Sequence, residues 1–136
     1  MTLPLSAQGL ALSLLALVFV WSALDKLLHW QEGLAEVREQ LRFFPVLLLS
    51  GTVLLQALGA AGLLGAAFFP AYPAARHFGG WSALALAGFT SMATVLFHAF
   101  WREASSRDVR RMLTVFLEHI ALVGGLLMAA TALLVT

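Results

Sequence analysis

Four long stretches with almost no charge constrain what this chain of 136 residues can fold into. Asp, Glu, Lys and Arg are absent from residues 1–24, 43–75 and 77–101. A fourth apolar stretch, 112–136, contains only Glu118 and His119 as ionisable residues. Each stretch exceeds the ~20 residues that cross a bilayer core. Charged residues make up 11% of the sequence, against roughly 25% in soluble domains, so the sequence predicts an all-α integral membrane protein.

We expect one domain over residues 1–136, built as a bundle of four transmembrane helices. The helices are expected at about 5–28, 45–69, 81–100 and 108–135. Pro45 suits a first helical turn, where its missing N–H costs no hydrogen bond, while Gly79 and Gly80 are expected to break the chain before the third helix. Since the N-terminal stretch lacks the basic region of a signal peptide, it is expected to remain as a helix.

The segment between the first two spans, QEGLAEVREQLRFFP, has a helical pattern of its own. Leu34, Val37 and Leu41 stand at i, i+3 and i+7, with acidic residues between them. This spacing predicts a short amphipathic helix lying at the membrane interface. Two roles fit such a helix, namely a solvated connector and a lid over a site.

Small residues at four-residue spacing mark two faces where helices are expected to pack closely, as is common in lipid. They are Ala57, Ala61 and Gly65 in the second helix and Ala83, Ala87 and Ser91 in the third.

The distribution of Lys and Arg predicts the orientation in the membrane. Of the 8 basic residues, only Arg76 lies in the loop between the second and third helices. The others follow the first and third helices and are Lys26, Arg38, Arg42, Arg102, Arg107, Arg110 and Arg111. By the positive-inside rule both basic loops are cytoplasmic, and the N- and C-termini lie outside.

Ionisable side chains within the spans all fall in the predicted cytoplasmic half. An ionisable residue inside a span costs about 2.5–3.5 kcal/mol on insertion scales, which favours a functional or paired role. We therefore expect a cluster at one depth, with Gln56 nearer the middle of the bilayer. Its members are Asp25, Lys26 and His29 of the first helix, His98 and Trp101 of the third, and Glu118 and His119 of the fourth. Two interpretations stay open: a ligand site, and a closed core in which Lys26 pairs with Glu118.

Two segments carry a resemblance to a known family. Residues 93–128, ATVLFHAFWREASSRDVRRMLTVFLEHIALVGGLLM, and the earlier FVWSALDKLLHW resemble the DoxX family of small bacterial membrane proteins. The resemblance implies a four-helix bundle in the bacterial cytoplasmic membrane, linked to redox work that includes thiosulfate:quinone oxidoreduction. The matching positions are Lys26, His98, Phe100 and Trp101, with Gly124 and Gly125 in packing roles. The chain departs from the family pattern at Gln56, where a glutamate is frequent, and at Glu118 and His119.

The leading hypothesis is a quinone-interacting subunit of a redox complex that handles sulfur or oxidative stress. Glu118, His98 and Lys26 are the expected catalytic residues, because a quinone headgroup needs hydrogen-bond donors and a proton source. The expected cofactor-binding residues are Trp101, Phe100, His119, Asp25 and Gln56.

No metal site is expected, and the absence of Cys excludes a thiolate or dithiol relay. Any enzymatic activity would therefore be that of an oxidoreductase subunit that receives electrons from a partner. The alternative is a non-catalytic membrane anchor or scaffold for soluble redox enzymes. A third hypothesis is a haem held by two of His29, His98 and His119, but we do not expect the protein to bind haem. Membrane lipid, a redox partner protein and further copies of the chain fit as partners, whereas nucleic acid does not.

Overall fold

The computed structural model describes residues 6–103 and 105–135, and these residues are almost entirely helical. They form five α-helices and a 3-10 turn, with no strand among them. The elements are α1 (Ala7–Leu28), α2 (Trp30–Gln40), α3 (Pro45–Phe68), α4 (Pro73–Phe97), η1 (Phe100–Arg102) and α5 (Ser106–Leu134). Four helices, α1, α3, α4 and α5, are long and apolar enough to span a membrane. The predicted all-α membrane fold is thus confirmed, while residue 5, the expected helix start, lies outside the described residues.

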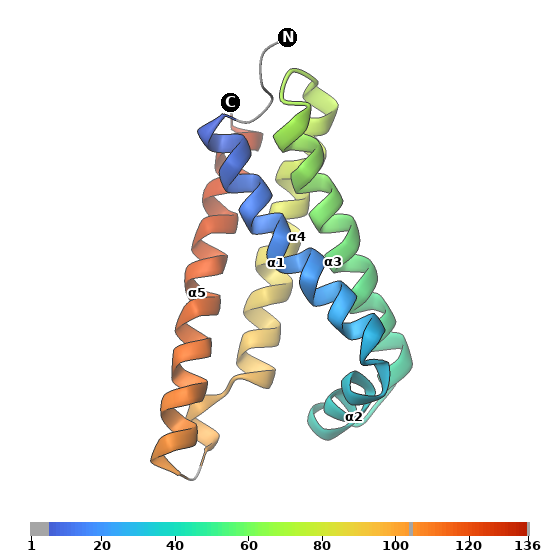
Figure 1. Ribbon diagram of the computed structural model, residues 1–136, viewed down its shortest axis with the longest axis vertical. Helices are drawn as coiled ribbons and strands as arrows, with labels where there is room; N and C mark the ends of the chain where they lie inside the picture. The colour runs from blue at the N-terminus through green and yellow to red at the C-terminus, as the bar shows by residue number, and fades with distance from the viewer. Residues whose placement is uncertain (1–5, 104, 136) are drawn as a thin grey trace.

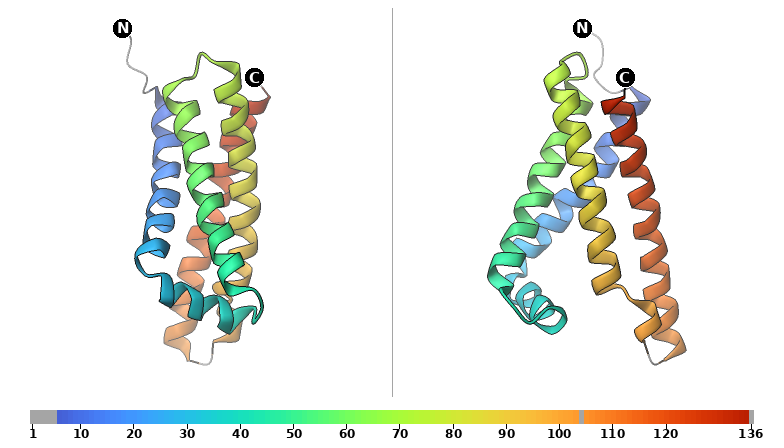
Figure 2. Two further views of the ribbon diagram at one scale, coloured as in Figure 1. Left: turned by 90° about the vertical axis from the view of Figure 1, so that its right-hand side faces the viewer. Right: turned by 180° about the vertical axis from the view of Figure 1, so that it is seen from behind.

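The four long helices form two pairs that diverge toward one end (Figures 1 and 2). Helix α1 packs on α3, α4 packs on α5, and α3 joins the pairs through α4, whereas α1 and α5 touch little. The pairs meet at the end where the N- and C-termini lie. They separate toward the opposite end, which carries α2 and η1 (Figure 1). The bundle is therefore closed at one end and open at the other.

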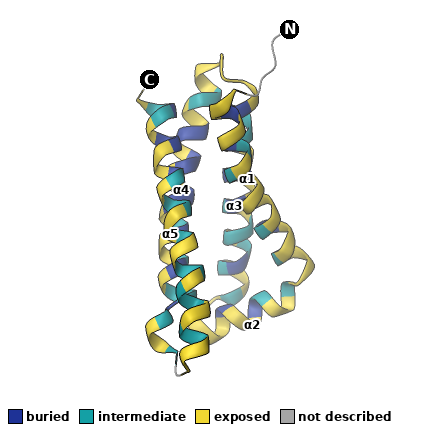
Figure 3. Ribbon diagram, turned by 60° about the vertical axis from the view of Figure 1, so that its left-hand side comes forward, coloured by how far each residue is buried: buried dark blue, intermediate teal, exposed yellow. Residues whose placement is uncertain are grey.

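The hydrophobic core lies at the closed end, where small residues let the backbones approach (Figure 3). A Cβ added at Gly59 of α3 would lie 2.7 Å from Leu86 of α4, and one at Gly79 of α4 would lie 2.6 Å from Ala66. Such close approach is what drives helix association in lipid. The remaining core is built from Leu12, Ala16, Phe19, Ala60, Leu63, Ala67, Ala83, Ala87, Leu126, Ala129, Ala130 and Leu133.

Two expectations about the helices were wrong. Helix α4 begins at Pro73 rather than at residue 81, with Pro73 in its first turn. Gly79 and Gly80 are buried inside it because they provide close contact with α3 and α5 instead of breaking the chain. On α3, Ala57 and Ala61 are exposed. The buried face of that helix is formed by Leu49, Gln56, Gly59, Ala60, Gly62, Leu63, Ala66 and Ala67, since a helix this rich in small residues offers more than one closely packing face.

The short amphipathic helix predicted between the first two spans is present. Helix α2 buries Leu34 and Val37 and packs against α3, so it lies across the open end of the bundle (Figure 1). At the start of α5, the Ser105 hydroxyl accepts a hydrogen bond of 3.1 Å from the Asp108 backbone N–H, which satisfies one of the free N–H groups of the first turn.

Candidate functional site

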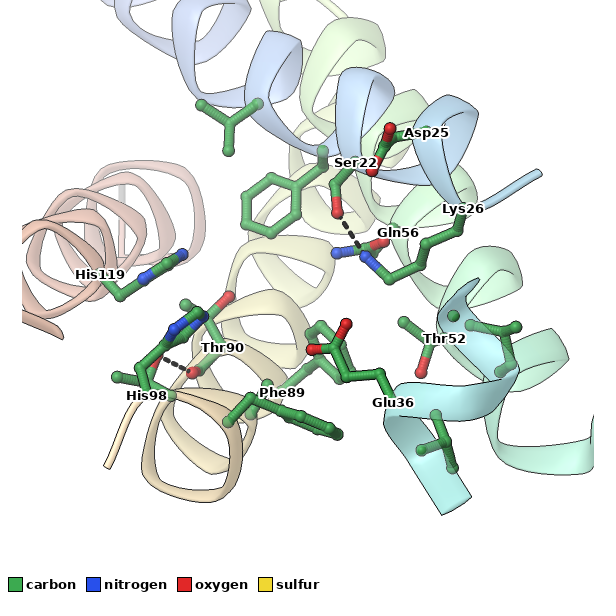
Figure 4. Close-up of a pocket in the computed structure, with 18 of the residues that line it drawn as sticks. Ser22, Asp25, Lys26, Glu36, Thr52, Gln56, Phe89, Thr90, His98 and His119 are labelled. Atoms are coloured by element: carbon green, nitrogen blue, oxygen red, sulfur yellow. Dashed lines mark hydrogen bonds between the residues drawn. The ribbon is translucent and has the colours of Figure 1, made fainter. Parts of the chain in front are cut away.

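A cavity of about 290 Å³ lies where the two helix pairs separate (Figure 4). All five α-helices contribute to its wall, which combines polar and apolar side chains. The apolar part includes three aromatic rings, Phe19, Phe89 and Phe97. The ionisable part consists of Asp25, Lys26, His29, Glu32, Glu36, His98 and His119. A hollow that combines apolar walls with placed polar groups is the usual form of a small-molecule site.

Lys26 brings a cation to the α1 side of this cavity. The side chain is half-buried, and its Nζ donates a hydrogen bond of 2.6 Å to the Ser22 hydroxyl one turn earlier (Figure 4). The carboxylates of Glu36 and Asp25 attract the ammonium, but neither forms an ion pair with it in the described residues. Asp25 instead accepts from the His29 ring at 3.1 Å. Lys26 therefore retains N–H groups for another acceptor.

Two stacked imidazoles face Lys26 from the other helix pair. The rings of His98 and His119 lie 4.8 Å apart, centroid to centroid, with 14° between their planes. His98 ends α4, where its backbone N–H bonds to the Thr94 carbonyl. His119 Nδ1 lies 2.9 Å from the Val115 carbonyl oxygen, and because a carbonyl only accepts, Nδ1 must carry the proton. In the neutral ring, Nε2 of His119 therefore has a free lone pair.

Three polar atoms of the cavity residues lack a hydrogen-bond partner. They are Gln56 Oε1, Thr90 Oγ1 and His98 Nδ1, and they are the complete set of buried, unpartnered side-chain N and O atoms among residues 6–103 and 105–135. Gln56 and Thr90 are each only 4% exposed. Leaving such a group unsatisfied costs about 1–3 kcal/mol. Since all three residues line one cavity, the cavity wall is suited to a ligand that forms hydrogen bonds with these atoms.

Five of the predicted site residues thus line the cavity: Asp25, Lys26, Gln56, His98 and His119. Glu118 does not. It is exposed on α5, and the described residues contain no ion pair between Glu118 and Lys26. Its neighbour His119 points inward instead, because adjacent residues lie about 100° apart around a helix.

Phe100 and Trp101 also lie outside the cavity wall. With Phe116 they form an aromatic cluster whose ring centroids are 5.2, 5.3 and 5.8 Å apart. His98 and Trp101, expected in one cluster, do not share a helix face because α4 ends at Phe97 and η1 turns the chain.

Sequence reasoning missed several contributors to the wall, among them Thr90 and Glu36. Thr90 lies one helical turn before Thr94 and two before His98. This four-residue spacing of polar residues was a signal in the sequence that could have identified Thr90. Glu36 of α2 points toward the cavity (Figure 4), but its exposed position on a surface helix gave no signal. No group of three or more His, Asp or Glu side chains that could hold a metal occurs in the described part of the chain.

The fold and the site together define the chain as a multi-pass helical membrane protein with a polar cavity at the open end of its bundle. No family model matches the chain, and comparisons with curated proteins and with solved structures find no match. The DoxX resemblance therefore stays a prediction from the residues that carry it.

Proposed function

We propose that this chain binds the headgroup of a membrane quinone in the cavity, as a subunit of a DoxX-like redox complex in the bacterial cytoplasmic membrane. The observation that carries the proposal is the placement of Lys26 and His98. They come from different helix pairs, lie within candidate spans, and line the same cavity beside Phe19, Phe89 and Phe97. A quinone headgroup is a flat ring with carbonyl acceptors, so it requires this combination of donors and aromatic walls.

The cavity also fits such a headgroup in size and polarity. Its volume of about 290 Å³ is at the lower end of the ~300–1,000 Å³ typical of ligand pockets. Lys26 has N–H groups left to donate to a carbonyl oxygen, and the unpartnered Nδ1 of His98 lies at the wall. Because α1 and α5 touch little, we expect the lipid tail of the quinone to leave the cavity between these two helices.

A bound quinone would supply transfer of two electrons and two protons. The chain's own residues orient the ring, exclude water and offer protons, while a partner delivers electrons. We place the cavity on the cytoplasmic side with both termini outside, because all the basic residues except Arg76 flank the open end of the bundle (Figure 1).

The scaffold function remains a second candidate because of one feature. Arg107, Arg110, Arg111 and Thr114 surround a shallow hollow at the start of α5, and the three arginines are exposed. Such a basic surface is suited to an acidic protein partner.

Photolabelling tests the proposed function. The protein in lipid nanodiscs is irradiated with a photoreactive quinone, and the labelled peptides are identified. We expect labels on α1 and α4 beside the cavity, and about a tenfold loss of labelling in Lys26→Met and in His98→Ala, since a hydrogen bond from a charged or buried donor is worth about 1.5 kcal/mol or more. His77→Ala is the matched control, because His77 is exposed and lies outside the cavity wall. Labelling that is unchanged in both cavity variants would reject the quinone site and leave the scaffold function.

A further inference from the structure

We infer that the cavity binds the reduced, dihydroxy form of its quinone more tightly than the oxidised form. This inference rests on the proposed function and adds the redox state of the ligand. It follows from which wall atoms accept hydrogen bonds and which donate them.

The first acceptor is the amide of Gln56. Its Oε1 is buried without a partner, on a side chain that is 4% exposed and that projects from α3 into the cavity (Figure 4). An amide oxygen can only accept a hydrogen bond. A quinone carbonyl also only accepts, so it leaves this atom unsatisfied. The hydroxyl of a quinol can donate to it.

The second acceptor is Nε2 of His119. The hydrogen bond from Nδ1 to the Val115 carbonyl, 2.9 Å long, fixes the proton on Nδ1, and stacking on His98 holds the ring plane. In the neutral imidazole, Nε2 then accepts only. Glu36, on the opposite side of the cavity, adds carboxylate oxygens that also only accept (Figure 4).

Donors at the wall suit either form, because carbonyl and hydroxyl oxygens both accept from an N–H of Lys26, of His98 or of the Gln56 amide. Lys26 donates one of its N–H groups to Ser22 and can give the others to a carbonyl or a hydroxyl oxygen. The Thr90 hydroxyl, unpartnered in this structure, can donate or accept. A ligand with two hydroxyl groups satisfies an acceptor on each side and still accepts from Lys26. A quinone satisfies the donors alone, so wall acceptors stay unpaired.

Anaerobic binding titrations test the inference on the intact protein in nanodiscs. Decylubiquinol and decylubiquinone are added separately, and binding is followed by quenching of tryptophan fluorescence. We expect the quinol to bind at least about tenfold more tightly, a difference of 1.4 kcal/mol. Gln56→Leu should weaken quinol binding more than quinone binding, because only the quinol loses an acceptor, so the preference shrinks. His119→Phe, which keeps an aromatic ring beside His98 but removes the lone pair, should act in the same direction.

Two controls keep the result interpretable. Gln31→Leu changes the same residue type at an exposed position outside the cavity wall and should preserve the preference. The unfolding temperature of ligand-free Gln56→Leu should equal or exceed that of the unchanged protein, because an unpartnered buried polar group is removed. If Gln56→Leu does not fold, the binding titrations of His119→Phe test the inference by themselves.

Equal or tighter binding of the quinone would overturn the inference, as would an equal loss of both ligands in Gln56→Leu and His119→Phe. These outcomes leave the quinone site in place. Binding of neither form would instead overturn the proposed function, and the inference with it.

Discussion

Lys26 shows how a charged residue can be held inside a candidate span without an ion pair. Its ammonium bonds to Ser22 of its own helix and is attracted by Glu36 and Asp25. A carboxylate directly bonded to the ammonium would occupy the N–H groups that a ligand needs. The polar wall is therefore arranged to leave donors free.

Lys26 and Glu118 should behave as independent residues in a double-mutant cycle. The structure places Glu118 exposed on α5, without an ion pair to Lys26 in the described residues. When two residues share no partner, the changes in unfolding free energy caused by substituting them add to within about 0.3–0.5 kcal/mol. The stability losses of Lys26→Met and Glu118→Gln, measured by unfolding in detergent, should therefore add. The double mutant serves as its own check: partial recovery of stability would reveal a pair that the structure does not contain.

At the scale of single residues, the sequence was a better guide to which residue types are important than to the direction in which their side chains face. Lys26 and His98 stood out because ionisable residues are rare within spans. The choice between Glu118 and His119 depends on how α5 is rotated against its neighbours, which tertiary packing decides. The end of α4 at Phe97, which displaces Trp101 from the wall, is likewise set by the contacts around η1.

At the scale of helices, glycines fix the distance between α3 and α4. Gly59 faces Leu86, leaving no room for a Cβ, whereas Gly51 of the same helix has nothing within 4 Å of the position that a Cβ would take. The closed end of the bundle depends on such contacts, and its tightness allows the other end to open.

Gly59→Ala should destabilise the protein by about 1–3 kcal/mol, since a methyl group is forced into a packed interface. Gly51→Ala is the matched control and should be neutral or slightly stabilising, because alanine has the higher helix propensity. Thermal unfolding in detergent measures both. Equal effects of the two substitutions would mean that α3 and α4 do not pack as described.

Helix positions followed well from hydropathy, and α2 from its amphipathic spacing. The start of α4 did not, because glycine pairs serve both as breaks and as packing surfaces. Only the contact of Gly79 with Ala66 distinguishes the two roles. The packing face of α3 was missed for a related reason, since small residues lie on several of its faces.

At the scale of the whole molecule, the divergence of two helix pairs creates the candidate site. Residues of all five α-helices meet at one cavity, although α1 and α5 touch little. The sequence predicted that polar groups share one depth. It gave no indication that the bundle opens there, because the angle between the pairs results from many packing contacts at the other end.

Native mass spectrometry shows which small molecule occupies the cavity of the protein. The protein is extracted from its membrane in mild detergent, and the masses of bound small molecules are recorded for the unchanged chain, His98→Ala and His77→Ala. We expect a quinone or quinol at about one per chain, retained in His77→Ala and largely lost in His98→Ala. Recovery of phospholipid alone from the unchanged protein, or a quinone retained equally by both variants, would contradict this expectation.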